Sequence, residues 1–266
     1  MVTNQVLPGE GLQIHKMPGH WVLARSGKRV LRPGGIALTR AMLNDLHIES
    51  CDSVVEFAPG LGITAKMTLS CQPASYVAIE RDAAAADSLR KNLPGDNVQI
   101  RNGVAEETGL PDQCATVIYG EAMLSMQTQA NKQRIATEVA RLLKTGGRYG
   151  LHELCFVPDW LDYARREDME SALSNAIHVG ARPLTVGEWR YLLTSAGLTV
   201  KTEALAPMSL LEPRRIVQDE GVWRALQFAT HIMLHREARR RVLAMRRAFR
   251  KCRPNLMAVV LTAAKE

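Results

Sequence analysis

The stretch SVVEFAPGLGITAKMTLSCQPASYVAIE, residues 53–80, joins two short apolar runs through a turn that carries glycines. The first run, residues 54–57, is typical of a strand buried in a parallel sheet that is covered on both faces. Gly60 and Gly62 then break the pattern, and without a Cβ atom their backbone can take positive φ and approach a ligand closely. A helix beginning near Ile63 would present free N–H groups at the same place. We therefore predict strand, turn, helix and strand, which is half of a nucleotide-binding α/β unit.

An acidic residue ends the second of these strands. Glu80 lies about 20 residues beyond the glycines, where a carboxylate can accept hydrogen bonds from both hydroxyls of a ribose without a 2′-phosphate. The glycine pattern of nicotinamide dinucleotide folds needs a third glycine for helix packing, and Lys66 and Met67 do not supply one. Nicotinamide binding is therefore our second choice. A strand-to-helix turn without any ligand is the remaining alternative.

The letters EFAPGLG, which begin at Glu56, resemble the acidic-x-Gly-x-Gly-x-Gly signature of class I S-adenosylmethionine-dependent methyltransferases. Ala58 stands in place of the first glycine. The resemblance implies that S-adenosylmethionine is the cofactor and that Ala58, Gly60 and Gly62 lie along its methionine end. It further implies that Glu56 helps to hold the ammonium group and that Glu80 binds the ribose.

The adenine end of the implied cofactor site departs from the family pattern. Members of the family often carry Gly-Asp-Ala after the third strand, expected here at residues 98–101, and the aspartate accepts from the adenine amino group. In this chain Val104 takes the place of that aspartate. We expect the N–H group of Ala105 to bond the ring, or Glu106 to reach the amino group by another route. Arg81, at the end of the second strand, completes the expected cofactor contacts.

Two candidate catalytic residues lie at the ends of later strands. Ligands of doubly wound sheets bind at the carboxyl ends of the strands, so residues there should face the transferred methyl group. His152, in the strand expected at residues 148–154, could remove a proton from the acceptor, with Glu153 orienting the ring. A hydrogen-bonded pair without a chemical role is the alternative. Glu121 follows the strand at residues 115–119 and is both a second candidate base and an expected cofactor contact.

The fold class is α/β. The resemblance implies a Rossmann-like, doubly wound sheet of seven strands in the order 3-2-1-4-5-7-6, with the last strand antiparallel. We expect residues 1–266 to form a single methyltransferase domain. Three segments fall outside the repeating pattern and are expected to cover the site: an N-terminal helical lid at residues 1–47, a lid insertion at 156–183, and a helical insertion before the last strand at 212–254.

Two helices have recognisable end signals. Thr185 followed by Glu188 forms a capping box, which predicts a helix over residues 185–196. Residues 131–144 carry an apolar stripe and precede Gly146, so we predict a helix that ends in a glycine cap.

Length and composition limit the possibilities further. A chain of 266 residues with 46 % hydrophobic content can bury one α/β core with additional helices. No apolar run reaches the length of a membrane span, and the first residues lack the apolar core of a secretory signal. The five cysteines are dispersed and include no C-x-x-C pair, which favours reduced thiols over disulfides or a zinc site. We expect a cytoplasmic protein without a bound metal.

The net charge of +7 is unevenly placed, because arginines gather near the C-terminus. Over residues 236–253, Ala238, Val242, Met245 and Phe249 form an apolar stripe, and arginines occupy another face. Such a face is usually solvated. Binding of phosphate, anionic lipid or nucleic acid is the alternative.

Our first hypothesis is methyl transfer from S-adenosylmethionine to a small, apolar or aromatic acceptor, yielding S-adenosylhomocysteine. The sulfonium supplies a reactive methyl group, so the protein must chiefly align the reactants and exclude water. Met123, Met126, Met169 and Met208 would suit a flexible apolar pocket, although core packing explains them equally well. The second hypothesis is a non-catalytic adenine-nucleotide or nucleic-acid binding module that uses the arginine-rich helix. Nucleic acid is the less favoured partner, because the Asp/Asn-Pro-Pro-Tyr/Phe motif of many nucleobase methyltransferases is absent.

Overall fold

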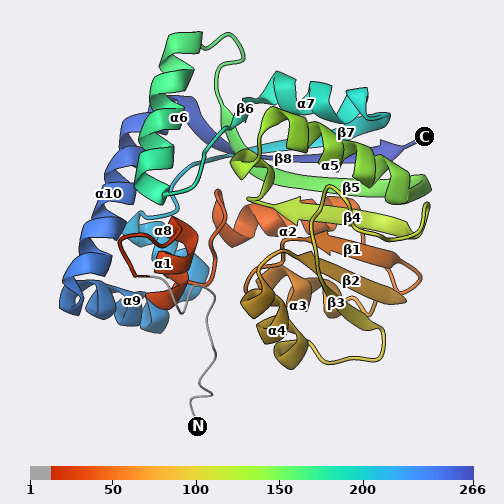
Figure 1. The fold of residues 1–266 in the computed structure, drawn as a ribbon, viewed down its shortest axis with the longest axis horizontal. Helices are drawn as coiled ribbons and strands as arrows, with labels where there is room; N and C mark the ends of the chain where they lie inside the picture. The colour runs from red at the N-terminus through yellow and green to blue at the C-terminus, as the bar shows by residue number, and fades with distance from the viewer. Residues whose placement is uncertain (1–12) are drawn as a thin grey trace.

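The computed structural model describes residues 13–266, so the first twelve residues of the expected N-terminal lid lie outside the described part. One mixed sheet forms the centre of the molecule (Figure 1). Its strands are β1 (Ser53–Phe57), β2 (Ser75–Glu80), β3 (Val98–Asn102), β4 (Ala115–Glu121), β5 (Leu143–Phe156), β6 (Leu184–Thr185), β7 (Leu198–Pro207) and β8 (Leu256–Lys265).

The strand order is β3-β2-β1-β4-β5-β8-β7, and β8 runs antiparallel to both of its neighbours. This confirms the predicted order, with β7 and β8 in the places of the sixth and seventh predicted strands. The short strand β6 was not predicted. It pairs with the last residues of β5, Cys155 and Phe156, beyond the end of the β4–β5 ladder at Glu121 and His152.

Helices cover both faces of the sheet. The helices of the described residues, in chain order, are α1 (Gly19–Arg25), α2 (Gly35–Leu46), α3 (Ile63–Leu69), α4 (Ala83–Asn92), α5 (Gln129–Leu142), α6 (Tyr163–Ile177), α7 (Val186–Ser195), α8 (Pro213–Glu220), α9 (Val222–Leu234) and α10 (Arg236–Cys252). Successive strand residues point to opposite faces. Val54 therefore packs in the core beneath α2, α3 and α4, and Val55 packs in the core beneath α5 and α7.

A third apolar core lies outside the sheet, among α1, α6, α8, α9 and α10. These five helices, which we call the helical layer, stand together on the left of Figure 1. Trp21, Leu173, Phe228 and Met245 are among their buried residues, and Phe156 of β5 connects this core to the sheet. The helical layer is therefore formed by the described parts of the three segments that fall outside the repeating strand and helix pattern of the sequence.

Candidate functional site

A cavity of about 560 Å³ lies between the carboxyl edge of the sheet and the helical layer. Most of the predicted cofactor contacts line its sheet side: Glu56, Ala58, Gly60, Glu80, Arg81, Val104, Ala105 and Glu121. Glu106 lies on the same wall. Largely apolar side chains line the opposite wall: Trp21, Leu31, Ile177, Val179, Met208, Leu210, Met245 and Phe249. The structure therefore brings most of the predicted site residues together around one space.

The glycine-bearing turn has the left-handed backbone that its sequence predicts. Ala58, Gly60 and Gly62 have φ values of 53°, 55° and 71°. A Cβ atom on Gly60 would meet no atom closer than 4.0 Å, so this residue faces open space. A Cβ atom on Gly62 would lie 2.8 Å from Leu89 of α4. A side chain at Gly62 would thus be strained by the positive φ and would displace the end of Leu89; contrary to the prediction, Gly62 is absent from the cavity wall.

Glu80 holds this turn in place from the end of β2. Its carboxylate accepts the backbone N–H groups of Gly60 and Asp82, each at 3.0 Å. Burial raises the pKa of Glu80, and the two backbone donors act against that rise. Each carboxylate oxygen keeps an acceptor lone pair beyond these bonds. The side chain is thus fixed at the cavity with remaining capacity to accept from a ligand.

Glu56 is more deeply buried than the resemblance suggests. It lines the cavity, and the hydroxyl groups of Tyr76 and Tyr119 both donate to its Oε2 atom. Burial raises the pKa of Glu56 to about 7, even though both tyrosines favour the ionised form. Its charge is therefore sensitive to what occupies the cavity.

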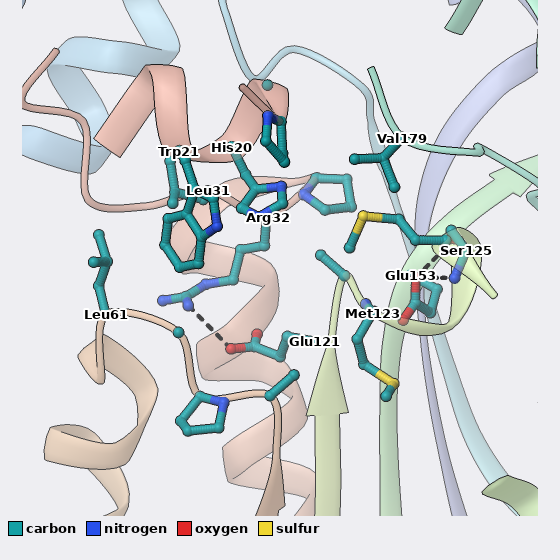
Figure 2. A pocket seen from close by; sticks show the side chains of 18 of the residues that line it. His20, Trp21, Leu31, Arg32, Leu61, Glu121, Met123, Ser125, Glu153 and Val179 are labelled. Atoms are coloured by element: carbon teal, nitrogen blue, oxygen red, sulfur yellow. Dashed lines mark hydrogen bonds and ion pairs between the residues drawn. The ribbon is translucent and has the colours of Figure 1, made fainter. Parts of the chain in front are cut away.

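Glu121 lies at the centre of the sheet-side wall (Figure 2). Its carboxylate accepts from the hydroxyl groups of Thr39 and Thr64, from Nδ1 of His152 at 2.7 Å, and from the guanidinium of Arg32 at 3.1 Å. Burial alone would raise the pKa of Glu121, but Arg32 and His152 outweigh it and lower the pKa to about 2. Glu121 is therefore a fixed anion at neutral pH and a weak base.

His152 does not reach the cavity. Its side chain is fully buried, Nδ1 contacts Glu121, and Nε2 lies 2.6 Å from the carbonyl oxygen of Pro33. Glu153 does not orient this ring, because adjacent strand residues point to opposite faces. Glu153 instead accepts the backbone N–H groups of Met123, Leu124 and Ser125, which anchors the turn after β4.

Arg32 was not found from the sequence. It precedes the first strand, has no motif around it, and enters the site only because its segment folds over the sheet edge. One guanidinium nitrogen pairs with Glu121, whereas Nε and Nη2 are buried without a hydrogen-bond partner in the structure. Figure 2 shows the guanidinium between Trp21 and Glu121, within the cavity. A buried cation with two unused donors is costly unless something accepts from them.

The remaining cavity wall partly follows the expectations. Met123, Met126 and Met208 line it, whereas Met169 packs inside the helical layer. His20 lines the cavity beside Trp21, with ring centroids 4.6 Å apart, and burial lowers its pKa to about 4.

Within residues 13–266, no cluster of three or more His, Cys, Asp or Glu side chains is arranged to hold a metal ion. Nor does this part of the chain contain a helix with the length and apolar character needed to cross a membrane.

Comparisons with known proteins agree with this geometry. Residues 55–151 match the family model described as a methyltransferase domain. An uncharacterized protein of Haemophilus influenzae is 27 % identical over 223 residues, which cover 81 % of this chain and 85 % of that protein.

Solved structures share the fold at low identity. YcgJ of Bacillus subtilis has a TM-score of 0.62 at 18 % identity, covering 86 % of this chain and 98 % of YcgJ. Geranyl diphosphate C-methyltransferase of Streptomyces coelicolor A3(2), solved with S-adenosylhomocysteine, has a TM-score of 0.61 at 16 % identity, covering 86 % of this chain and 77 % of that one. The cyclase SpnF has a TM-score of 0.66 at 17 % identity, covering 91 % and 89 %. Residues 55–151 therefore form a methyltransferase domain, and the sheet has the strand order predicted from the resemblance to class I enzymes that use S-adenosylmethionine.

Proposed function

We propose that the protein transfers the methyl group of S-adenosylmethionine to a small, apolar or aromatic acceptor, with S-adenosylhomocysteine as the second product. The observation that carries this proposal is that a single cavity has one polar wall and one mostly apolar wall. The sheet-side wall has the polar groups that a nucleoside and an amino acid need, and the wall made by the helical layer is mostly apolar. An apolar wall favours acceptors that bury hydrocarbon.

For the nucleoside part of the cofactor, we assign Glu80 to the ribose hydroxyls. Its carboxylate is fixed by two backbone N–H groups and keeps free acceptor capacity toward the cavity. Val104 and Ala105 would lie against the adenine, since they continue the same wall beyond β3. Arg81, which follows Glu80, is assigned to the rim of this half of the site.

For the amino-acid part of the cofactor, we assign the pair of Arg32 and Glu121. Methionine presents an ammonium and a carboxylate on one carbon, and this pair presents the opposite charges side by side. The two unpartnered donors of Arg32 would bind the carboxylate. Glu121, ionised at neutral pH, would attract the ammonium through its charge, with Glu56 behind it.

Bound S-adenosylmethionine supplies an electrophilic methyl group. The chain must then hold the acceptor in line with that group and keep water away. His152 acts in this account as a positioning residue, because it fixes Glu121 from within the protein. Neither Glu121 nor His152 is assigned to remove a proton from the acceptor.

The amino-acid subsite can be tested by comparing two nucleosides in calorimetric titrations. S-Adenosylhomocysteine carries the amino-acid end, and 5′-methylthioadenosine lacks it. Arg32→Met should weaken binding of S-adenosylhomocysteine by about one to two orders of magnitude, the usual effect of losing charge-assisted hydrogen bonds. It should leave 5′-methylthioadenosine nearly unaffected. Arg40→Met, which removes an exposed arginine of α2, is the matched control. Equal losses for both nucleosides would contradict the assignment of Arg32.

The acceptor class needs a separate assay. Purified protein is incubated with S-adenosylmethionine and pools of small apolar and aromatic compounds, and S-adenosylhomocysteine is measured. Formation that depends on such a pool supports the proposal. If only polynucleotide supports product formation, or if polynucleotide binds in a salt-sensitive way without any product, the proposed acceptor class is wrong.

The cytoplasm is our proposed compartment. Its support is the set of five cysteines, all of which are free in the structure.

A further inference from the structure

The helix α9 has its most apolar face toward solvent. Five of its side chains are exposed: Val222 by 65 %, Trp223 by 73 %, Leu226 by 56 %, Met233 by 71 % and Leu234 by 73 %. At about 100° per residue these five positions fall within an arc of about 120°. A surface helix normally presents its polar side to solvent, so this exposed apolar face departs from the usual arrangement. We call these five residues the α9 surface.

The orientation of α9 is fixed by its inner face. Phe228, on the side opposite to the α9 surface, is 5 % exposed and belongs to the core of the helical layer. Ala225 and Ile232 pack against the same core. The helix cannot turn to bury the α9 surface without removing these residues from their contacts. The exposed apolar arc is therefore a property of the fold.

Cations gather on α10, which follows the C-terminal end of the α9 surface. Residues 212–253 contain twelve Arg and Lys residues against four Asp and Glu, a formal charge of +8, whereas the whole chain carries +7. Arg236, Arg239, Arg240 and Arg247 are exposed on α10 and form no ion pair within the described residues. The guanidinium of Arg239 donates to the carbonyl oxygen of Met233, 3.4 Å away, at the end of α9. Basic side chains thus begin where the α9 surface ends.

We propose that the α9 surface and the adjacent arginines of α10 dock the protein onto an anionic lipid bilayer. Lipid tails accept the exposed Trp and Leu side chains, and anionic head groups accept the arginines. In Figure 1 α9 and α10 meet at the lower left corner of the molecule, at the far side of the helical layer from the sheet. The helix has 13 residues, so it lies in the interface and does not span the bilayer.

Two other occupants fit less well. A second copy of the chain on a twofold axis would place the same arginines against one another, and like charges in an interface are unfavourable. A polynucleotide would pair with the arginines but would leave the apolar arc in water. The bilayer alone satisfies both features. The proposal does not depend on the methyl acceptor, although the inner side of α10 also lines the cavity through Met245 and Phe249.

Cosedimentation with lipid vesicles tests the proposal on the full chain. The protein should bind vesicles of equimolar phosphatidylcholine and phosphatidylglycerol and bind phosphatidylcholine vesicles weakly. The double variant Trp223→Ser/Leu226→Ser should lose about tenfold or more in binding, because both side chains enter the apolar region. The double variant Arg236→Glu/Arg240→Glu should lose at least about tenfold on anionic vesicles and little on neutral ones.

Matched controls come from exposed positions elsewhere on the molecule. Trp160→Ser removes a tryptophan that is 85 % exposed outside α9, and Lys91→Glu/Lys144→Glu makes the same charge change as the arginine variant. Both controls should bind vesicles like the parent protein. Circular dichroism confirms that every variant is folded.

Three results would overturn the proposal. The first is failure of the parent protein to bind anionic vesicles at low salt. The second is binding that depends on the arginines but not on Trp223 and Leu226, which would identify a general polyanion surface. The third is a dimer in analytical ultracentrifugation that Trp223→Ser/Leu226→Ser dissociates, which would identify a second copy as the occupant.

Discussion

Among single residues, Glu80 acts on both the protein backbone and the ligand. It fixes the glycine-bearing turn through two backbone N–H groups, and we assign it to the ribose. The sequence could predict this residue because a carboxylate at the end of a strand, after a glycine turn, has a recognisable position. Its hydrogen bonds to the turn could not be predicted, since they depend on the distance between β2 and the loop after β1.

Glu80→Gln should weaken binding of S-adenosylhomocysteine by about one to two orders of magnitude, because the amide accepts more weakly and presents a donor to one hydroxyl. Glu106→Gln, on the same cavity wall, should have a smaller effect. Both are measured by calorimetry after circular dichroism confirms that they are folded. Equal affinity of Glu80→Gln and the parent protein would remove the ribose assignment.

The raised pKa of Glu56 predicts that the stability of the ligand-free protein depends on pH. Burial raises the pKa of Glu56 to about 7 from the ordinary value of 4.5, so the folded chain holds a proton that the unfolded chain releases. The resulting stabilisation is complete at pH values below the unfolded pKa and is lost as the pH rises through the folded pKa.

Glu56→Gln stays neutral and should keep that stabilisation. Relative to the parent protein, its free energy of unfolding should rise by about 3 kcal/mol between about pH 4 and about pH 8. Urea unfolding at a series of pH values measures it. Glu107→Gln, at an exposed position, should track the parent protein. A Glu56→Gln curve parallel to that of the parent protein would show that Glu56 is ionised throughout.

Site residues that lie outside any sequence motif could not be predicted. Arg32 joins Glu121 only after the segment between α1 and α2 has folded over the sheet edge, and no spacing in the sequence signals that contact. His152 was visible as a polar residue in a strand, but the carbonyl oxygen of Pro33 that occupies its Nε2 atom was not. Residues brought together by tertiary contacts of the N-terminal segment are thus the part of the site that sequence reasoning missed.

Elements with strong local signals were predicted well. Thr185 caps α7 as expected: its hydroxyl accepts from the N–H group of Glu188, and the Glu188 carboxylate accepts from the N–H group of Thr185. The end of α5 was predicted wrongly. The helix stops at Leu142 because Leu143 pairs with Ala115 of β4, and this pairing overrides the helix propensity of the following residues.

Thr185→Ala should lower the free energy of unfolding by about 1 kcal/mol, the usual effect of losing an N-cap side chain. Thr194→Ala, an exposed position on the same helix, is the control and should change stability by less than about 0.5 kcal/mol. Urea unfolding compares the two. Equal effects would mean that the cap contributes nothing beyond helix propensity.

At the scale of the whole molecule, a buried ionic cluster connects segments that are far apart in the sequence. Lys28, which follows α1, lies 3.9 Å from Asp219 and 3.7 Å from Glu220 at the end of α8, and all three side chains are at most 1 % exposed. Glu220 also accepts the backbone N–H groups of Arg29 and Val30. The segment that carries Arg32 is thereby held against the helical layer.

Lys28→Met should destabilise the protein by about 3 kcal/mol or more, because it leaves the buried Asp219 without a cation and Glu220 with only the half-exposed Arg29. The loss should be partly reversed in Lys28→Met/Asp219→Asn, which removes one of those charges. Thermal unfolding of the parent protein and both variants gives the comparison. A single variant as stable as the parent protein would show that the cluster does not hold the segment.

The sheet order was predicted from the resemblance to class I methyltransferases, because the spacing of strands and helices does not prove an order by itself. The position of the cavity was predicted from the rule that ligands bind at the carboxyl ends of parallel strands. The helical layer could not be assembled in advance. Its segments lack a shared period, and their contacts depend on which apolar faces remain after the sheet is covered. The exposed apolar face of α9 can be recognised only once Phe228 is seen to point inward.

The central claim is that the cavity at the carboxyl edge of the sheet binds S-adenosylmethionine through Glu80 and the pair of Arg32 and Glu121. Calorimetric titration of the parent protein with S-adenosylhomocysteine, and separately with NAD, tests it most directly. We predict saturable binding of one S-adenosylhomocysteine per chain and no measurable binding of NAD. Binding of NAD without binding of S-adenosylhomocysteine would contradict the account.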